Sequence, residues 1–174
     1  MATPENIDVL FGAETIQARI AELGAAITRD FQDRHLTVLV VLKGSFVFAA
    51  DLIRSIDLPM HVEFIGLKSY GSRQETSGVV QITMDLKHPV MDHDLLIVED
   101  IVDTGLTISY LKDNLATRKP KSIKLATLLH KPARAQKTVE IDYLGFTVPD
   151  RFVIGYGLDD NGLMRNLPFI GAYK

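Results

Sequence analysis

Two adjacent carboxylates, Glu99 and Asp100, follow the apolar run LLIV at residues 95–98. Neighbouring carboxylates repel each other, so they are tolerated where they face hydroxyl groups, a cation or water. A third carboxylate, Asp103, comes shortly afterwards, within reach of whatever the pair binds. These three acids predict a binding site for a hydroxyl-bearing or cation-bound ligand at the end of a buried strand.

The turn that follows, Asp103–Thr107 (DTGLT), has the composition of a phosphate-binding turn. A glycine and two threonines at the start of a helix present unpaired backbone N–H groups and hydroxyls to an anion. Each residue also has an ordinary interpretation, since Asp103 or Thr104 could cap the helix and the two preceding acids could be solvated. The ordinary interpretation is favoured for any one of them alone, and the combination at the end of one apolar strand favours a site.

Strands that alternate with helices must position these residues. Apolar side chains at 16, 20, 23 and 27 fall on one face of a helix, as do Phe46, Ala49, Ala50 and Ile53 in the stretch 46–56. The pattern predicts three helices near residues 16–27, 46–56 and 107–118, and strands at 37–42, 61–68, 79–84, 95–98, 123–129, 141–145 and 152–154. This alternation predicts an α/β fold with a mainly parallel sheet flanked by helices, in which ligands bind beyond the carboxyl ends of the strands.

One segment has no apolar pattern of its own. Residues 69–78, SYGSRQETSG, contain two glycines and no aliphatic side chain. Because such a segment cannot bury itself, we expect an exposed, mobile loop beside the site.

Composition restricts the class of protein. With 174 residues, of which 47% are hydrophobic and 24% charged, the chain has the size and balance of one globular domain. The net charge of −3 argues against broad neutralisation of nucleic-acid phosphates. The longest apolar stretch, Val38–Leu42, is too short to span a membrane, and the N-terminus lacks the pattern of a signal peptide. The lack of cysteine fits a reducing compartment, so we expect a cytoplasmic protein. From the charge and the short apolar stretches, we expect neither nucleic acid nor membrane as a partner.

Other nucleotide and acidic-pair motifs do not match. The chain has neither G-x-x-x-x-G-K-[ST] nor G-x-G-x-x-G. A receiver domain also ends a strand with two acids, but it has its acidic pair near the N-terminus and no D-T-G-x-T after it.

Residues 95–107 resemble the phosphoribosyl-pyrophosphate motif of the type I phosphoribosyltransferases, which is an apolar strand, two acids and then D-T-G-x-T. The form E-D-x-x-D-T-G is similar to the hypoxanthine–guanine branch, and the likeness extends from VLVVLKG at Val38 to RFVIGYGLDDNGLMR at Arg151. It implies the type I phosphoribosyltransferase fold in a single domain over residues 1–174, with a core at about 30–150. A small hood from the N-terminal and C-terminal segments and a mobile loop would complete that fold.

The resemblance also implies an activity. Relatives join hypoxanthine or guanine to phosphoribosyl pyrophosphate, which yields IMP or GMP and pyrophosphate, with Mg²⁺ as cofactor, and they assemble as homodimers or homotetramers. Two alternatives remain: a transferase for another base such as xanthine, and a nucleotide-sensing regulatory protein with this fold.

Roles at the sugar phosphate come from the same resemblance. Asp103 is implied as the general base that takes the proton from N7 of the purine while N9 bonds to C1′. Mg²⁺ is implied at Glu99 and Asp100, with Asp159 as an acid for a second ion. The implied ribose and 5′-phosphate contacts are Glu99, Asp100, Asp103, Thr104, Gly105, Leu106 and Thr107.

The resemblance implies that other segments of the chain bind the pyrophosphate and the purine base. The family has a non-proline cis peptide before the residue matched by Lys43, and the implied pyrophosphate contacts are Lys43, Gly44, Ser69, Tyr70 and Arg165. Lys131 matches a lysine that donates to the O6 carbonyl, Phe152 would stack on the purine, and the backbone of Val153 would contact the base edge. Taken singly, Lys131 is more often a surface lysine and Phe152 a core aromatic, and only the matched set favours the functional roles.

The sequence departs from the family at two places and has one unassigned cluster. Leu106 stands where some relatives have a basic residue, and Ser45 where some have a second glycine. The cluster Asp92-His93-Asp94 could suggest a metal, but a solvated turn before a strand is the favoured interpretation.

Overall fold

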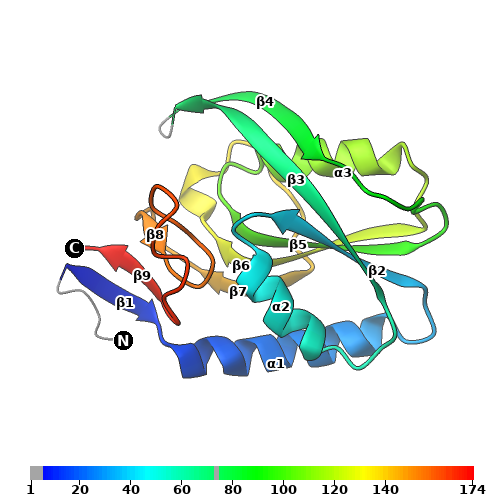
Figure 1. Ribbon diagram of the computed structural model, residues 1–174, viewed down its shortest axis with the longest axis horizontal. Coiled ribbons are helices and arrows are strands. Elements are labelled where there is room, and N and C mark those ends of the chain that lie inside the picture. Colours follow the sequence, from blue (N-terminus) through cyan, green and yellow to red (C-terminus); the bar gives the residue numbers. More distant parts are fainter. Residues whose placement is uncertain (1–5, 73–74) are drawn as a thin grey trace.

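The structure, a computed structural model, describes residues 6–72 and 75–174, and describes no side chain between 69 and 79. Its main body is a six-stranded sheet in the order β4-β3-β2-β5-β6-β7, and a three-stranded sheet, β1-β9-β8, lies beside it (Figure 1). Within the described residues, no helix has the length and apolar character needed to cross a bilayer.

The helices are α1 (Ala13–Asp30), α2 (Phe46–Arg54) and α3 (Leu106–Ala116), with a short 3₁₀ turn at Pro132–Arg134. The strands are β1 (Ile7–Phe11), β2 (Leu36–Leu42), β3 (His61–Ser72), β4 (Glu75–Met84), β5 (Asp94–Val102), β6 (Ser122–His130), β7 (Tyr143–Thr147), β8 (Val153–Ile154) and β9 (Ile170–Tyr173).

Parallel pairing dominates the large sheet, as predicted. β2 pairs in parallel with β3 and β5, and the parallel ladder continues through β6 to β7. Only β4, at the edge, runs antiparallel to its neighbour in the described part of this sheet. β5 lies near the middle, so the acids at its carboxyl end are flanked by strands on both sides.

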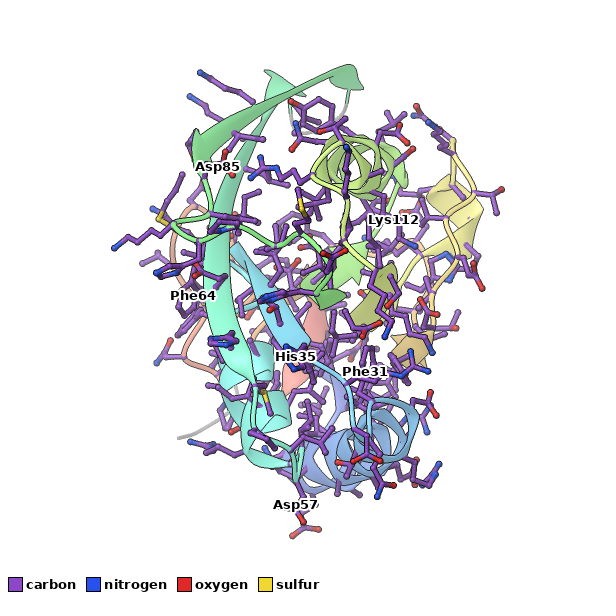
Figure 2. The ribbon with its side chains drawn as sticks, turned by 90° about the vertical axis from the view of Figure 1, so that its right-hand side faces the viewer. Phe31, His35, Asp57, Phe64, Asp85 and Lys112 are labelled. Carbon is purple, nitrogen blue, oxygen red and sulfur yellow. The ribbon has the colours of Figure 1, made fainter. Side chains whose placement is uncertain are left out.

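Apolar side chains cover both faces of the sheet. The predicted face of α1 is confirmed, because Ile16, Ile20, Leu23 and Ile27 are all buried against one face of the sheet together with α2. Ile108, Leu111 and Leu115 of α3 pack on the opposite face. Figure 2 shows this layering, with Lys112 of α3 on one side of the sheet and Phe31, just after α1, on the other. A sheet covered on both faces holds its strand ends rigidly, which suits a site built there.

The predicted face of α2 is confirmed for Ala49 and Ile53, which pack in or against the core, and is wrong for Phe46 and Ala50. Phe46 and Ala50 are exposed, whereas Phe48, Ala49 and Leu52 are buried. The helix FVFAADLIR is apolar over most of its circumference, so its periodicity does not identify which side packs on the sheet.

The loop predicted over residues 69–78 is also wrong for the backbone that the structure describes. β3 extends to Ser72 and β4 begins at Glu75, and Gly71 pairs with Thr76 across an antiparallel ladder. Backbone hydrogen bonds define this hairpin, so it needs no aliphatic side chains.

The small sheet joins the two ends of the described chain. β9 pairs antiparallel with both β1 and β8, with Ile7 opposite Tyr173 and Val153 opposite Ala172. Arg151 adds a link, because its Nη2 donates to Asp8 Oδ2 at 2.8 Å and to the carbonyl of Tyr173 at 2.6 Å. Sequence periodicity did not predict β1 or β9 as strands.

Candidate active site

Glu99 and Asp100 lie inside β5, near its carboxyl end, rather than after the strand. Glu99 is 8% exposed, and its Oε2 has no hydrogen-bond partner among the described residues. Burial, reinforced by the neighbouring charge of Asp100, raises the pKa of the Glu99 carboxyl well above its usual value. Burial also raises the pKa of Asp100. The interpretation as solvated loop acids is therefore wrong for Glu99, whereas the positive charge of Arg165 partly opposes the raised pKa of Asp100.

Gly44 approaches this acidic pair more closely than any other residue type could. A Cβ at that position would lie 1.5 Å from Asp100 Oδ2. The peptide bond between Leu42 and Lys43 is cis, as the resemblance implied, and Lys43 itself is exposed. Ser45 is buried and donates to the carbonyl of Val41. The loop between β2 and α2 therefore lies directly against Asp100.

The turn before α3 presents backbone N–H groups and a hydroxyl at the start of the helix. Gly105, with φ of 79°, occupies the left-handed region just before the helix and has no side chain to cap it. The N–H groups of Gln136 and Lys137 both donate to the carbonyl of Thr104 at 3.0 Å, which fixes the turn from outside. The first N–H groups of α3 have no helical partner, and the N–H of Leu106 donates to Thr104 Oγ1 at 3.4 Å. An anion at this turn would accept from the helix N-terminus and from the Thr104 hydroxyl.

Asp103 is positioned by an arginine that sequence analysis missed. Its Oδ2 lies 3.3 Å from Arg134 Nη1, while its Oδ1 is buried without a hydrogen-bond partner among the described residues. Arg134 also lies 3.8 Å, through Nε, from Asp150 Oδ1. The sequence did offer one signal for Arg134, because it is a second basic residue three positions after Lys131 in HKPAR.

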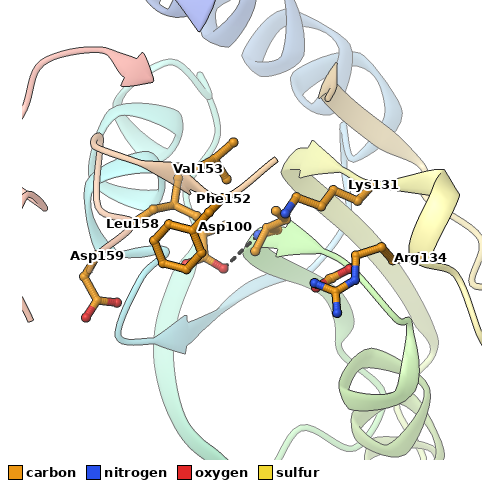
Figure 3. A pocket seen from close by; sticks show the side chains of 9 residues that line it. Asp100, Lys131, Arg134, Phe152, Val153, Leu158 and Asp159 are labelled. Atoms are coloured by element: carbon orange, nitrogen blue, oxygen red, sulfur yellow. Dashed lines mark hydrogen bonds and ion pairs between the residues drawn. The ribbon is translucent and has the colours of Figure 1, made fainter. Parts of the chain in front are cut away.

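Two cavities meet at Asp103. The smaller, about 110 Å³, is formed by the turn and lined by Glu99, Ile101, Val102, Asp103, Thr104, Gly105, Thr107 and Ile108. The larger, about 330 Å³, is drawn in Figure 3 and lined by Asp100, Ile101, Asp103, Lys131, Arg134, Phe152, Val153, Leu158 and Asp159. Ile101 and Asp103 line both cavities, so the two cavities adjoin at Asp103.

Lys131 and Phe152 face each other across the larger cavity (Figure 3). Lys131 is only 5% exposed, so the interpretation as a surface lysine is wrong. Burial lowers the pKa of its ammonium, and the charges of Asp103 and Asp150 oppose that shift. Phe152 is 46% exposed and stacks on Tyr173 with ring centroids 6.2 Å apart, so it is not a core aromatic. Val153 is buried in β8 and lines the same cavity.

Arg165 and Asp159 close one side of the site. Arg165 Nη2 lies 2.9 Å from Asp159 Oδ1, and its Nη1 donates to the carbonyl of Gly157 at 2.6 Å. Gly157 has a φ of 101°, and a Cβ there would lie 2.2 Å from the carbonyl oxygen of Gly44. These contacts bring the predicted Lys43-Gly44 and Arg165 segments together. The side chains of Ser69 and Tyr70 lie outside the described residues, so their predicted role is untested.

The acidic pair fits a hard cation. Mg²⁺ takes one or two carboxylates and fills its other positions with water and phosphate oxygens. Glu99 and Asp100 would supply the carboxylates, and Glu99 Oε2 is buried without a hydrogen-bond partner among the described residues. Asp159 fits less simply, because its Oδ1 pairs with Arg165 and its Oδ2 accepts the N–H of Gly162 at 2.6 Å. In the described part of the chain, no three His, Asp or Glu side chains enclose a common ion position.

The comparisons with known proteins agree with one another. Residues 10–161 match the family described as the phosphoribosyl transferase domain. The hypoxanthine-guanine phosphoribosyltransferase of Bacillus subtilis (strain 168) is 47% identical over 166 residues, which cover 95% of this chain and 92% of the relative. That of Mycobacterium tuberculosis (strain ATCC 25618 / H37Rv) is 47% identical over 170 residues, covering 94% and 84%.

A solved structure extends the likeness to the backbone. The hypoxanthine phosphoribosyltransferase of Staphylococcus aureus superposes with a TM-score of 0.92 at 43% sequence identity, over 96% of this chain and 91% of that chain. The type I fold implied by the resemblance is confirmed by this match and by the mainly parallel sheet.

Proposed function

Because this chain belongs to the phosphoribosyltransferase family, we propose that it transfers the phosphoribosyl group of phosphoribosyl pyrophosphate to hypoxanthine or guanine in purine salvage. The observation that carries this proposal is the position of Asp103 between the two cavities. The smaller cavity is bordered by the turn before α3, whose N–H groups suit a phosphate. The larger cavity is bordered by the ring of Phe152 and by the buried ammonium of Lys131. A sugar phosphate in the first would therefore present C1′ to a base in the second.

The proposed transfer has a simple balance of bonds. N9 of the base bonds to C1′, the bond from C1′ to pyrophosphate oxygen breaks, and its electron pair leaves with pyrophosphate. The proton on N7 goes to Asp103, whose Oδ1 has no other partner among the described side chains. A positioned carboxylate of this kind contributes about 10²–10⁴-fold in rate.

Binding of the sugar phosphate divides between two elements. The 5′-phosphate accepts from the N–H groups of residues 106 and 107 and from the hydroxyls of Thr104 and Thr107, while Glu99 and Asp100 face the ribose hydroxyls. Lys43, Gly44 and Arg165 face the departing pyrophosphate, with the predicted help of Ser69 and Tyr70. When bound at Glu99 and Asp100, Mg²⁺ would offset negative charge on pyrophosphate.

Selection of the base falls to Lys131. An ammonium group only donates, so it pairs with the O6 carbonyl of a 6-oxopurine and leaves the 6-amino group of adenine without an acceptor. Its burial strengthens this discrimination, because water cannot replace the lost partner. The exposed face of Phe152 provides a surface for the purine ring.

The test is a comparison of four bases. Protein, Mg²⁺ and phosphoribosyl pyrophosphate are mixed with hypoxanthine, guanine, xanthine or adenine, and nucleotide formation is followed. We expect IMP and GMP and no AMP. An absence of product with every purine would overturn the proposal, and a preference for xanthine would support the transferase for another base.

We also propose that the chain works in the cytoplasm as a homodimer or homotetramer. Phe64 and Met84 are 45% and 41% exposed on the β3–β4 side, where a cavity of about 560 Å³ also includes Leu42 and Val62. An apolar surface of this kind is typical of an interface. Light scattering after size-exclusion chromatography should give twice or four times the chain mass, and Phe64→Glu should lower it.

A further inference from the structure

A tyrosine in the connection between β8 and β9 has an unfavourable backbone conformation. Tyr156 has a φ of 49° and stands between Gly155 and Gly157, whose φ values are 92° and 101°. This left-handed region suits glycine, whereas a bulky residue remains there only when surrounding contacts hold it. The Tyr156 side chain is 5% exposed and packs in the main core with α1 and α2. Contacts of this side chain must therefore offset the cost of the backbone conformation.

The Tyr156 hydroxyl links this connection to two helices. It donates to Asp51 Oδ2 of α2, and Gln17 Nε2 of α1 donates to the same oxygen at 2.9 Å. Arg54 donates to the other oxygen, Asp51 Oδ1. Burial, together with the hydrogen bond to Asp51, raises the pKa of Tyr156 above its usual value, so the hydroxyl keeps its proton and remains a donor. Both oxygens of the Asp51 carboxylate are thus engaged, which fixes the hydroxyl relative to α2.

The same connection also contacts the loop that precedes α2. A Cβ at Gly157 would lie 2.2 Å from the carbonyl oxygen of Gly44 and 3.6 Å from Val47 Cβ. Figure 1 shows the connection after β8 next to α2. The connection is therefore fastened to α2 and to its preceding loop at two adjacent residues, through the hydroxyl of Tyr156 and the backbone of Gly157.

Gly157 in turn sets the position of Arg165. The Gly157 N–H donates to the Arg165 carbonyl at 3.0 Å, and Arg165 Nη1 donates back to the Gly157 carbonyl at 2.6 Å. Arg165 Nη2 lies 2.9 Å from Asp159 Oδ1. Gly157 holds both the backbone and the guanidinium of Arg165, so a shift of Gly157 away from Gly44 would move the arginine as well.

We propose that Tyr156 and Asp51 are positioning residues for pyrophosphate. Their hydrogen bond holds Gly157 against Gly44, and it thereby keeps Arg165 in register with the loop before α2. The inference rests on the proposed function, which assigns both segments to the departing pyrophosphate. Recognition by groups on separate segments depends on their relative placement, so a displacement of about 1 Å is costly.

The base side of the site should not depend on this hydrogen bond. Neither Tyr156 nor Asp51 is among the described residues that line the two cavities at Asp103. Lys131 follows β6, and Phe152 precedes β8, whose pairing with β9 holds it independently. Loss of the hydrogen bond should therefore weaken the binding of phosphoribosyl pyrophosphate and of pyrophosphate, and it should leave hypoxanthine binding near the parent level.

Tyr156→Phe tests the proposal, because it removes the hydroxyl and keeps the ring. Tyr143→Phe is the matched control: Tyr143 is also 5% exposed and donates to a helix carboxylate, Asp30 Oδ2 at 2.6 Å, but it lies at the amino end of β7. We expect both variants to lower the thermal midpoint by similar amounts. Only Tyr156→Phe should raise the KM for phosphoribosyl pyrophosphate, by about 10-fold, with kcat and the KM for hypoxanthine little changed.

Calorimetric titration with pyrophosphate in excess Mg²⁺ needs no turnover, so it tests the inference separately from the proposed function. We expect the affinity to fall about 10-fold in Tyr156→Phe and to stay at the parent level in Tyr143→Phe. Asp51→Asn keeps an oxygen that can accept from the hydroxyl, so it should bind pyrophosphate more like the parent than Asp51→Ala does.

Three results would contradict the inference: a parent-like pyrophosphate affinity in Tyr156→Phe, an equal loss in Tyr143→Phe, or no pyrophosphate binding by the parent protein. A failure to form nucleotide while pyrophosphate binding follows the expected pattern would count against the proposed function alone.

Discussion

The two oxygens of the Asp103 carboxylate have different surroundings. Oδ2 lies near Arg134, whereas Oδ1 is buried and has no partner among the described residues. We expect Asp103→Asn to keep the fold and to lower kcat by about 10²-fold or more, because an amide cannot take the N7 proton. Steady-state kinetics with hypoxanthine measures the loss, and Asp113→Asn, on the exposed side of α3, is the matched control. Near-normal turnover would remove Asp103 from the role of base.

Lys131 offers a test of base selection. Replacing its buried ammonium by an amide, which both donates and accepts, should relax the rejection of adenine. We expect Lys131→Gln to reduce kcat/KM for hypoxanthine by about 10-fold or more and to narrow the hypoxanthine-to-adenine ratio. Lys137→Gln, a more exposed lysine on the same connection, should leave that ratio unchanged. An unaltered ratio in Lys131→Gln would contradict the O6 assignment.

Glu99 predicts a dependence of stability on pH. Because burial raises its pKa in the folded chain, the folded state keeps a proton that the unfolded state releases above about pH 4.3. The free energy of unfolding therefore falls as pH rises from there through the raised pKa. Glu99→Gln removes the ionisable group, so it should remove this pH dependence. We expect the free energy of unfolding to rise by about 1 kcal/mol at neutral pH and to change little near pH 4. Urea unfolding in metal-free buffer measures both, and an equal gain at the two pH values would contradict the explanation.

Among single residues, those of the family motif could be predicted from the sequence, whereas residues that contact the motif only in the folded chain could not. The acids of β5, Lys131 and Phe152 could be predicted to lie at one site because their types and order match a family pattern, and all of them line the two cavities. Arg134 could not, because its contact with Asp103 depends on how the β6–β7 connection folds back on the turn. The burial of Lys131 could not be predicted from the sequence either, because it results from the packing of several segments.

At the scale of elements, Gly105 determines how the turn before α3 is built. Its φ of 79° is unfavourable for other residues, and a Cβ there would lie 2.1 Å from the carbonyl oxygen of Lys137. Gly162 has a similar φ of 83° but open space around it. We expect Gly162→Ala to cost about 1 kcal/mol, and Gly105→Ala to cost more and to raise the KM for phosphoribosyl pyrophosphate. Chemical denaturation and kinetics test this, and equal costs would show that the Lys137 contact is unimportant.

α1, β2 and β5 were predicted close to their observed bounds because each has one dominant periodicity. α1 has a single apolar face, and β2 and β5 are continuous apolar runs. α2 is apolar on most sides, so its inward face depended on the sheet it meets. The extension of β3 and β4 arose from backbone pairing, which side-chain patterns do not record.

At the scale of the whole molecule, the base cavity depends on the end of the described chain. Tyr173 stacks on Phe152, and its hydroxyl donates to Asp160 Oδ2 at 3.1 Å. An aromatic pair contributes about 0.5–1.5 kcal/mol, so Tyr173→Ala should raise the KM for hypoxanthine by roughly 2–10-fold and barely change that for phosphoribosyl pyrophosphate. Tyr173→Phe keeps the ring and should behave like the parent. A change in both KM values would instead indicate a general loss of structure.

The pairing of β9 between β1 and β8 sets an order of events during synthesis. Strands of the large sheet can pair as the chain emerges, since they are neighbours over residues 36–147. The small sheet must wait until residue 173 has left the ribosome and can pair with β1, which precedes every strand of the large sheet. A nascent chain would thus hold its sugar-phosphate turn ready while the support for Phe152 is still missing. Competence to take up a purine would therefore follow the synthesis of β9, after every strand of the large sheet has been made.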